Sequence, residues 1–124
     1  MHTPYRLAKP WRLKSSKAIA GLFFSGNMVR KKPILLVYQW GPAKTGCLVS
    51  GFTVPKRAVK KAVNRNRIKR VMREAYRKQE TPWPALPNDL QFMWVYQSAE
   101  PADFKLIYEK MTEALLEVKR REQL

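Results

Sequence analysis

The 124-residue chain contains few of the side chains that catalysis and covalent cross-linking require. Its one histidine is His2 and its one cysteine is Cys47. A single cysteine excludes an internal disulfide and suits a reducing compartment, so we expect a cytoplasmic protein. No acidic residue precedes Glu74, and the nine acids from Glu74 onward are spread out. Hydrolytic and metal-dependent sites need clustered carboxylates or histidines, so we expect neither catalytic residues nor metal ligands here.

Long hydrophobic runs are also missing. The longest apolar stretch, Ala18 to Phe24, has seven residues, whereas a membrane-spanning helix needs about 20. The residues before it include prolines and a tryptophan, and no clear small-residue cleavage pattern follows, so a secretory leader is not indicated either. We therefore expect no membrane partner.

Positive charge is abundant and is concentrated in the N-terminal part of the sequence. The chain carries 25 Lys and Arg against 9 Asp and Glu, for a net charge of +16. Residues 1–73 hold 18 of the 25 cations and no acid at all. Because so much like charge repels itself in a compact state, it indicates a polyanionic partner. Apolar residues make up 45% of the chain, enough for one folded domain.

Local patterns predict the order of the elements. Residues 1–14 contain two prolines and no periodicity, and read as an extended basic arm before a single domain over residues 15–124. Apolar spacing and capping residues predict three helices. They run from Ser15 or Ser16 to about residue 25, over residues 56–78 after Pro55, and from Phe104 to about Val118. Runs of β-branched, aliphatic and aromatic residues predict strands over 34–40, 47–54 and 90–96. We expect the first two strands to form a hairpin. The order αββαβα predicts an α+β two-layer sandwich with helices packed on a small mixed sheet.

The predicted central helix is the most strongly charged element. It carries eleven Lys and Arg in 23 residues against one acid, Glu74. At about 100° per residue, an apolar arc of Ile68, Val71, Met72 and Ala75 is separate from a cationic arc. Guanidinium groups match phosphate oxygens in bidentate fashion, and Asn66 beside them can read a base edge or a 2′-hydroxyl. The residues that we expect to bind RNA are Lys56, Arg57, Lys60, Lys61, Arg65, Asn66, Arg67, Lys69, Arg70, Arg73 and Arg77.

These residues resemble a family signature. The run Val54-Pro55-Lys56-Arg57, followed by Asn64-Arg65-Asn66-Arg67-Ile68-Lys69-Arg70 and Arg73, resembles the Arg-Asn-Arg motif of the bacterial ribonuclease P protein family. Ile19, Phe23 and Gly26 match the spacing of its F-x-x-x-F-x-x-G pattern, with Ile19 where the family has an aromatic residue. The resemblance covers most of residues 12–121.

The resemblance implies more than composition does. It implies a left-handed βαβ crossover and a protein subunit that binds the catalytic RNA of ribonuclease P through the Arg-Asn-Arg helix. A cleft between the first helix and the sheet would take the 5′ leader of precursor tRNA, with Ile19, Phe23 and Tyr38 as candidate lining residues. The RNA would perform the endonucleolytic cleavage that produces the mature tRNA 5′ end, with Mg²⁺ bound mainly by that RNA.

Two other functions fit the bulk properties. A structural RNA-binding protein, such as a ribosomal protein, shares the size and the charge, and only the motif separates it from a ribonuclease P subunit. A DNA-binding regulator would need base-reading side chains and usually a dimer interface, and neither is evident. We therefore expect no DNA partner, while the sequence does not indicate the oligomeric state.

Overall fold

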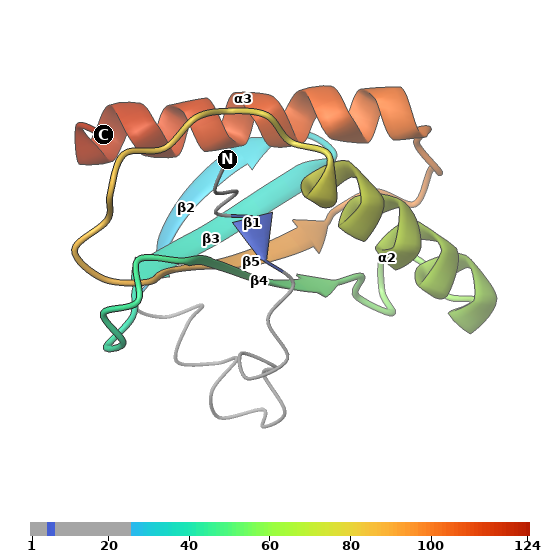
Figure 1. Ribbon diagram of the computed structural model, residues 1–124. Coiled ribbons are helices and arrows are strands. Elements are labelled where there is room, and N and C mark those ends of the chain that lie inside the picture. The colour runs from blue at the N-terminus through green and yellow to red at the C-terminus, as the bar shows by residue number, and fades with distance from the viewer. Residues whose placement is uncertain (1–4, 7–25) are drawn as a thin grey trace.

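The structure, a computed structural model, describes residues 5–6 and 26–124 and forms a mixed sheet with helices on one face (Figure 1). The described elements are β1 (Tyr5–Arg6), β2 (Asn27–Lys31), β3 (Ile34–Trp40), β4 (Leu48–Thr53), α2 (Ala62–Arg77), β5 (Leu90–Tyr96) and α3 (Phe104–Glu122). The strand order is β1-β4-β5-β3-β2. The predicted α+β sandwich with a mixed sheet is therefore confirmed. The helix expected from Ser15 or Ser16 lies outside the described residues.

The predicted hairpin between residues 34–40 and 47–54 is wrong. β5 lies between the two strands, antiparallel to β3 (Ile34↔Tyr96) and parallel to β4 (Leu48↔Leu90). The reason is visible in the segment that joins β3 to β4. Its backbone bonds go to the start of β5: Gly41 N–H donates to Asp89 O, Asp89 N–H to Ala43 O, and Leu90 N–H to Cys47 O. The turn residues that indicated a hairpin instead form backbone hydrogen bonds with the residues at the start of β5.

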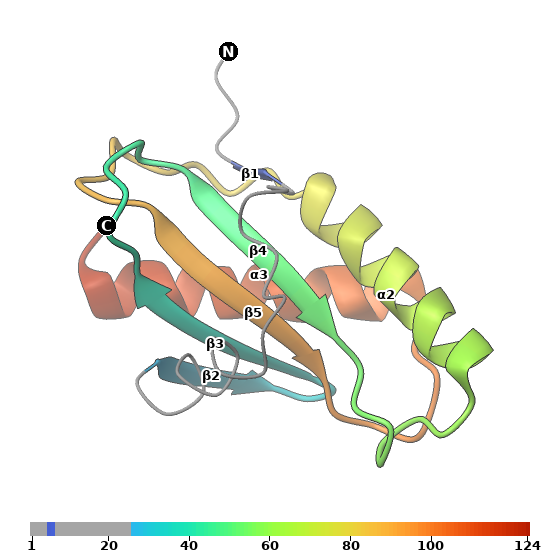
Figure 2. The same ribbon diagram turned by 90° about the horizontal axis from the view of Figure 1, so that it is seen from below.

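The crossover from β4 through α2 to β5 joins two parallel neighbours. Both helices contribute to the core on the same face of the sheet. In Figure 2 α3 lies behind the sheet, and α2 packs on that same face. When the picture is turned so that the arrows of β4 and β5 point up, β5 lies to the right of β4. This is a left-handed crossover, as the resemblance implied.

Two element boundaries differ from the sequence expectation. α2 begins at Ala62, six residues later than predicted. The N–H groups of Ala58 and Val59 both donate to Pro55 O, so Pro55 opens a turn and not the helix. β2 was not predicted, because only Val29 of its five residues is buried and an edge strand of this kind has no apolar alternation. Two residues of the predicted arm form β1, which pairs in parallel with β4.

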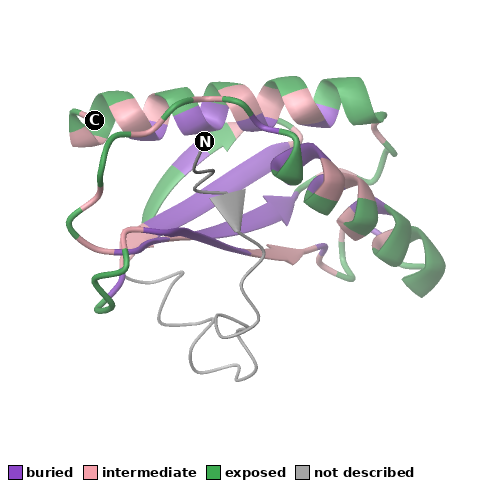
Figure 3. Cartoon of the chain, in the orientation of Figure 1, coloured by how far each residue is buried: buried purple, intermediate pink, exposed green. Residues whose placement is uncertain are grey.

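The core has a central strand that is buried on both faces. Toward the helices, Phe92, Trp94 and Tyr96 of β5 pack with Ile34 and Leu36 of β3. On the opposite face Leu35, Val37, Met93 and Val95 are also buried. Figure 3 shows β3 and β5 buried along most of their length, whereas the outer surfaces of α2 and α3 are exposed. α2 is thus attached to a rigid sheet through one side only.

We expect the replacement Asp103→Ala to destabilise the fold by about 1 kcal/mol through the start of α3. Asp103 is the N-cap residue, and its Oδ1 accepts a hydrogen bond of 2.9 Å from the Leu106 N–H. Urea unfolding followed by circular dichroism measures the loss. Asp103→Asn is the matched control, because it keeps a capping oxygen and should stay within a few tenths of a kcal/mol of the parent. Equal losses in both variants would show that charge and not capping is at work.

Candidate nucleic-acid interface

The outer surface of α2 is cationic, and its inner surface packs on the core. Ile68, Met72, Ala75 and Tyr76 are buried. This agrees with the predicted apolar arc, except that Tyr76 takes a buried place and Val71 is only half-buried. Of the residues predicted to bind RNA, Asn66, Arg67, Arg70, Arg73 and Arg77 are exposed, whereas Arg65 and Lys69 are half-buried. The helix therefore offers its guanidinium groups on the side that faces away from the core.

The acids of the chain do not neutralise this surface. All nine carboxylates lie in the described part of the chain. Within residues 26–124, the ion pairs closer than 4.0 Å join Glu74 to Arg77 and Lys78, and otherwise stay within α3. The hydrogen bond from Arg77 lowers the pKa of Glu74. Arg77 is thus the one predicted RNA-binding residue with a carboxylate partner, while Arg67, Lys69, Arg70 and Arg73 keep uncompensated charge.

Four further cations lie in the segment before α2. Lys56, Arg57, Lys60 and Lys61 are exposed, and the buried Val59 holds this segment on the core. Lys61 is the N-cap residue of α2, without a side-chain hydrogen bond to the helix, and the first turn holds no acid. Because a helix N-terminus carries partial positive charge, these four cations and the start of α2 together produce a positive electrostatic potential. All four residues were predicted as helical, whereas the structure places them in a turn and a short irregular segment that precede the helix.

Arg65 differs from the other arginines of the motif. Its Nη1 donates to Val59 O at 3.0 Å and to Lys60 O at 2.6 Å. The side chain therefore folds back over the turn that precedes α2. A sequence pattern does not reveal this, because the turn itself was not predicted.

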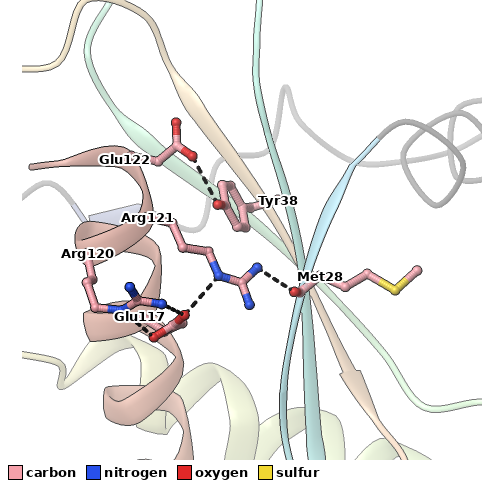
Figure 4. A network of polar contacts seen from close by, with 6 residues as sticks. All are labelled: Met28, Tyr38, Glu117, Arg120, Arg121 and Glu122. Carbon is pink, nitrogen blue, oxygen red and sulfur yellow. Dashed lines mark hydrogen bonds and ion pairs between the residues drawn. The ribbon is translucent and has the colours of Figure 1, made fainter.

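The three candidate residues for a leader cleft have different outcomes. Ile19 and Phe23 lie outside the described residues. Tyr38, on β3, is only 1% exposed, and its hydroxyl donates to Glu122 Oε2 at 3.1 Å (Figure 4). Burial, and then the hydrogen bond with Glu122, raises the pKa of Tyr38. Tyr38 thus packs beneath α3, and no exposed ring surface supports its assignment to a cleft.

The C-terminal end of α3 is tied to the far edge of the sheet. Arg121 donates to Met28 O of β2 at 2.7 Å and to Glu117 Oε2 at 2.9 Å, as Figure 4 shows. Hydrogen bonds from Arg120 and Arg121 lower the pKa of Glu117 to about 2. This carboxylate is therefore ionised and paired within its own helix. It is not available to compensate the cations of α2.

Within residues 5–6 and 26–124, no three His, Cys, Asp or Glu side chains gather in a group that could hold a metal ion. None of the described helices has the length and apolar character needed to cross a bilayer.

A small α+β domain with an uncompensated cationic helix defines a class, the proteins that bind RNA or another polyanion through backbone phosphates. The family model described as Ribonuclease P matches residues 7–119. The chain belongs to the ribonuclease P protein family, as its motif predicted. Its role is that of a protein subunit of ribonuclease P, a tRNA-processing endonuclease complex with an RNA partner, and the alternatives of a ribosomal protein and a DNA-binding regulator are set aside.

Named relatives agree with this assignment. The ribonuclease P protein component of Nitrosomonas eutropha is 29% identical over 117 residues, covering 94% of each chain. That of Porphyromonas gingivalis is 32% identical over 126 residues, covering 92% of this chain and 87% of the relative. The structure of the Staphylococcus aureus RNase P protein superposes with a TM-score of 0.70 at 18% identity, covering 88% and 95% of the two chains. That of Thermotoga maritima gives 0.59 at 20% identity, covering 89% and 94%. At these identities the structures support the fold alone.

Proposed function

We propose that the outer surface of α2 and the turn before it bind the catalytic RNA of ribonuclease P, and that the protein also contacts the 5′ leader of precursor tRNA. The observation that carries the first part is the uncompensated charge of Arg67, Lys69, Arg70 and Arg73. Like charges one turn apart, such as Lys69 and Arg73, destabilise an isolated helix by a few tenths of a kcal/mol. Phosphate groups placed between them reverse that sign.

The chemistry of the surface favours RNA in particular. Arginine forks bind phosphate oxygens in bidentate fashion, and an exposed asparagine among them can bond to a 2′-hydroxyl or a base edge. Asn66 has this place on the helix. The leader contact rests on the family resemblance, with Ile19 and Phe23 as its candidate residues, because single-stranded RNA favours apolar and aromatic platforms with basic rims.

We assign the cleavage itself to the RNA subunit and its Mg²⁺ ions. Three of the acids of this chain have structural interactions: Glu117 pairs with two arginines, Asp103 caps α3, and Asp89 accepts a hydrogen bond from the Cys47 N–H. The protein contributes by holding the substrate and by neutralising phosphates that Mg²⁺ would otherwise have to screen, which lowers the Mg²⁺ concentration that the complex needs. We place this assembly in the cytoplasm, which fits a chain with one cysteine.

The test is a cleavage assay at limiting Mg²⁺. Purified protein is mixed with a bacterial ribonuclease P RNA and a precursor tRNA, and the rate of 5′ cleavage is compared with that of the RNA alone. We expect the protein to accelerate cleavage, and to do so less for a precursor with a truncated leader. A rate that does not respond to the protein contradicts the proposed role. An equal acceleration for both precursors contradicts the leader contact only.

A further inference from the structure

Arg65 and Arg67 flank Asn66 but face different surroundings. At about 100° per residue, side chains two positions apart lie on nearly opposite sides of a helix. Arg67 is exposed and has no hydrogen-bond partner in the described part of the chain. Arg65 is half-buried and donates from one nitrogen to two carbonyl oxygens, those of Val59 and Lys60. Its backbone N–H also donates to Lys61 O at 3.1 Å, so Arg65 binds three consecutive carbonyl groups.

We propose that Arg65 is a positioning residue, which holds the turn before α2 so that its cations and those of the helix form one RNA-binding surface. The inference rests on the proposed function of that surface. It assigns Arg65 a different task from the phosphate contact that its place in the motif suggests.

The turn needs such a tie because little else in it opposes its own charge. Lys56, Arg57, Lys60 and Lys61 repel one another, and the only backbone bonds inside residues 55–60 are those from Ala58 and Val59 to Pro55 O. The Val59 side chain anchors one point on the core. Hydrogen bonds from a charged donor are roughly twice as strong as neutral ones. The Arg65 guanidinium therefore holds the backbone of Val59 and Lys60, just before the chain enters α2.

The arrangement also explains why a fixed turn matters for binding. A flexible lysine-rich segment must be ordered when it meets RNA, and each residue fixed costs about 1–2 kcal/mol of conformational entropy. A turn that is already held beside α2 avoids this cost. Loss of Arg65 should therefore weaken RNA binding through Lys60 and Lys61, not through a missing phosphate contact.

A double-mutant cycle separates the two explanations. Arg65→Ala and the matched control Arg67→Ala are each made in the parent and in a Lys60→Ala, Lys61→Ala background, and affinity for a bacterial ribonuclease P RNA is measured. We expect Arg65→Ala to lower affinity about tenfold in the parent and less than about twofold in the background, since coupled residues are not additive. Arg67→Ala should cost the same in both. Arg65→Lys keeps the positive charge, but its ammonium ends one bond short of the Arg65 Nη1 position, so full recovery of affinity in this variant would favour a phosphate contact over the positioning role.

A second readout uses the free protein. Limited trypsin digestion after Lys60 and Lys61 should be several times faster in Arg65→Ala than in Arg67→Ala, at equal thermal stability. If Arg65→Ala does not fold, Arg65→Gln, whose shorter amide cannot span both carbonyls, takes its place. The positioning role would be overturned if Arg65→Ala lost equal affinity in both backgrounds, or if it were digested no faster than Arg67→Ala. Failure of the parent to bind RNA would overturn the proposed function, whereas the digestion result judges the turn independently of RNA.

Discussion

Replacing Arg70 and Arg73 together by alanine is expected to weaken binding to ribonuclease P RNA on the order of 100-fold, if each contributes one charge-assisted bond to phosphate. Both side chains are exposed on α2 and have no carboxylate within 4.0 Å in residues 26–124. Each phosphate contact also adds about 0.7 to 0.9 units to the slope of log affinity against log salt. The variant should therefore bind with a slope that is shallower by about 1.5 units. Filter binding or fluorescence anisotropy over a salt series measures both quantities.

The matched control removes the same amount of charge from the other described helix. Lys105 and Arg120 are exposed on α3, and Arg120 is paired with Glu117. Lys105→Ala with Arg120→Ala should change RNA affinity only a few-fold, through the net charge of the molecule. If the α3 variant loses as much affinity and slope as the α2 variant, binding depends on overall charge and α2 is not the interface.

The replacement Trp94→Ala should have the largest effect on stability, a loss of about 3–5 kcal/mol. Trp94 lies at the centre of β5, is fully buried, and its indole N–H donates to Ser50 Oγ at 3.2 Å. Its ring lies 5.8 Å from that of Phe92 and 6.0 Å from that of Tyr76, one of the buried residues through which α2 packs on the core. Since domains are stable by only about 5–15 kcal/mol, the variant should be partly unfolded at moderate temperature. Urea unfolding measures the change.

Two milder variants define the cause. Trp94→Phe keeps an aromatic ring in the core and should recover at least half of the lost stability. Ser50→Ala leaves the ring in place but removes the acceptor of its N–H, which should cost about 1–3 kcal/mol. A Trp94→Ala protein that unfolds at the parent's urea concentration would mean that the space closes around the missing ring and that β5 does not organise the core.

The sequence allowed the element types to be predicted more successfully than their pairing. Apolar runs over residues 34–40 and 90–96 and the periodic spacing of α3 correspond closely to observed elements. The predicted hairpin between residues 34–40 and 47–54 was wrong because adjacency in sequence favours such a pairing, whereas backbone groups of Gly41 and Cys47 bond to residues 89 and 90. Such long-range hydrogen bonds leave no trace in local composition.

The candidate site shows the same division. The cationic arc of α2 follows from helical periodicity alone, and the structure confirms which arc is buried. The distinct task of Arg65 could not be predicted, since it depends on where the helix begins, and Pro55 favoured an earlier start. Tyr38 was equally ambiguous, because an aromatic residue on a strand packs inward or stacks on a ligand depending on what covers it. Here α3 covers it, and Glu122 binds its hydroxyl.

The position of β5 between β3 and β4 also sets an order of events on the ribosome. Synthesis proceeds from the N-terminus, yet the strand that joins the two halves of the sheet comes from residues 90–96. A nascent chain therefore exposes the lysine- and arginine-rich residues 56–78 before β5, which completes the surface beneath α2, has left the exit tunnel. α2 therefore cannot pack in its final position until residues 90–96 have emerged from the ribosome.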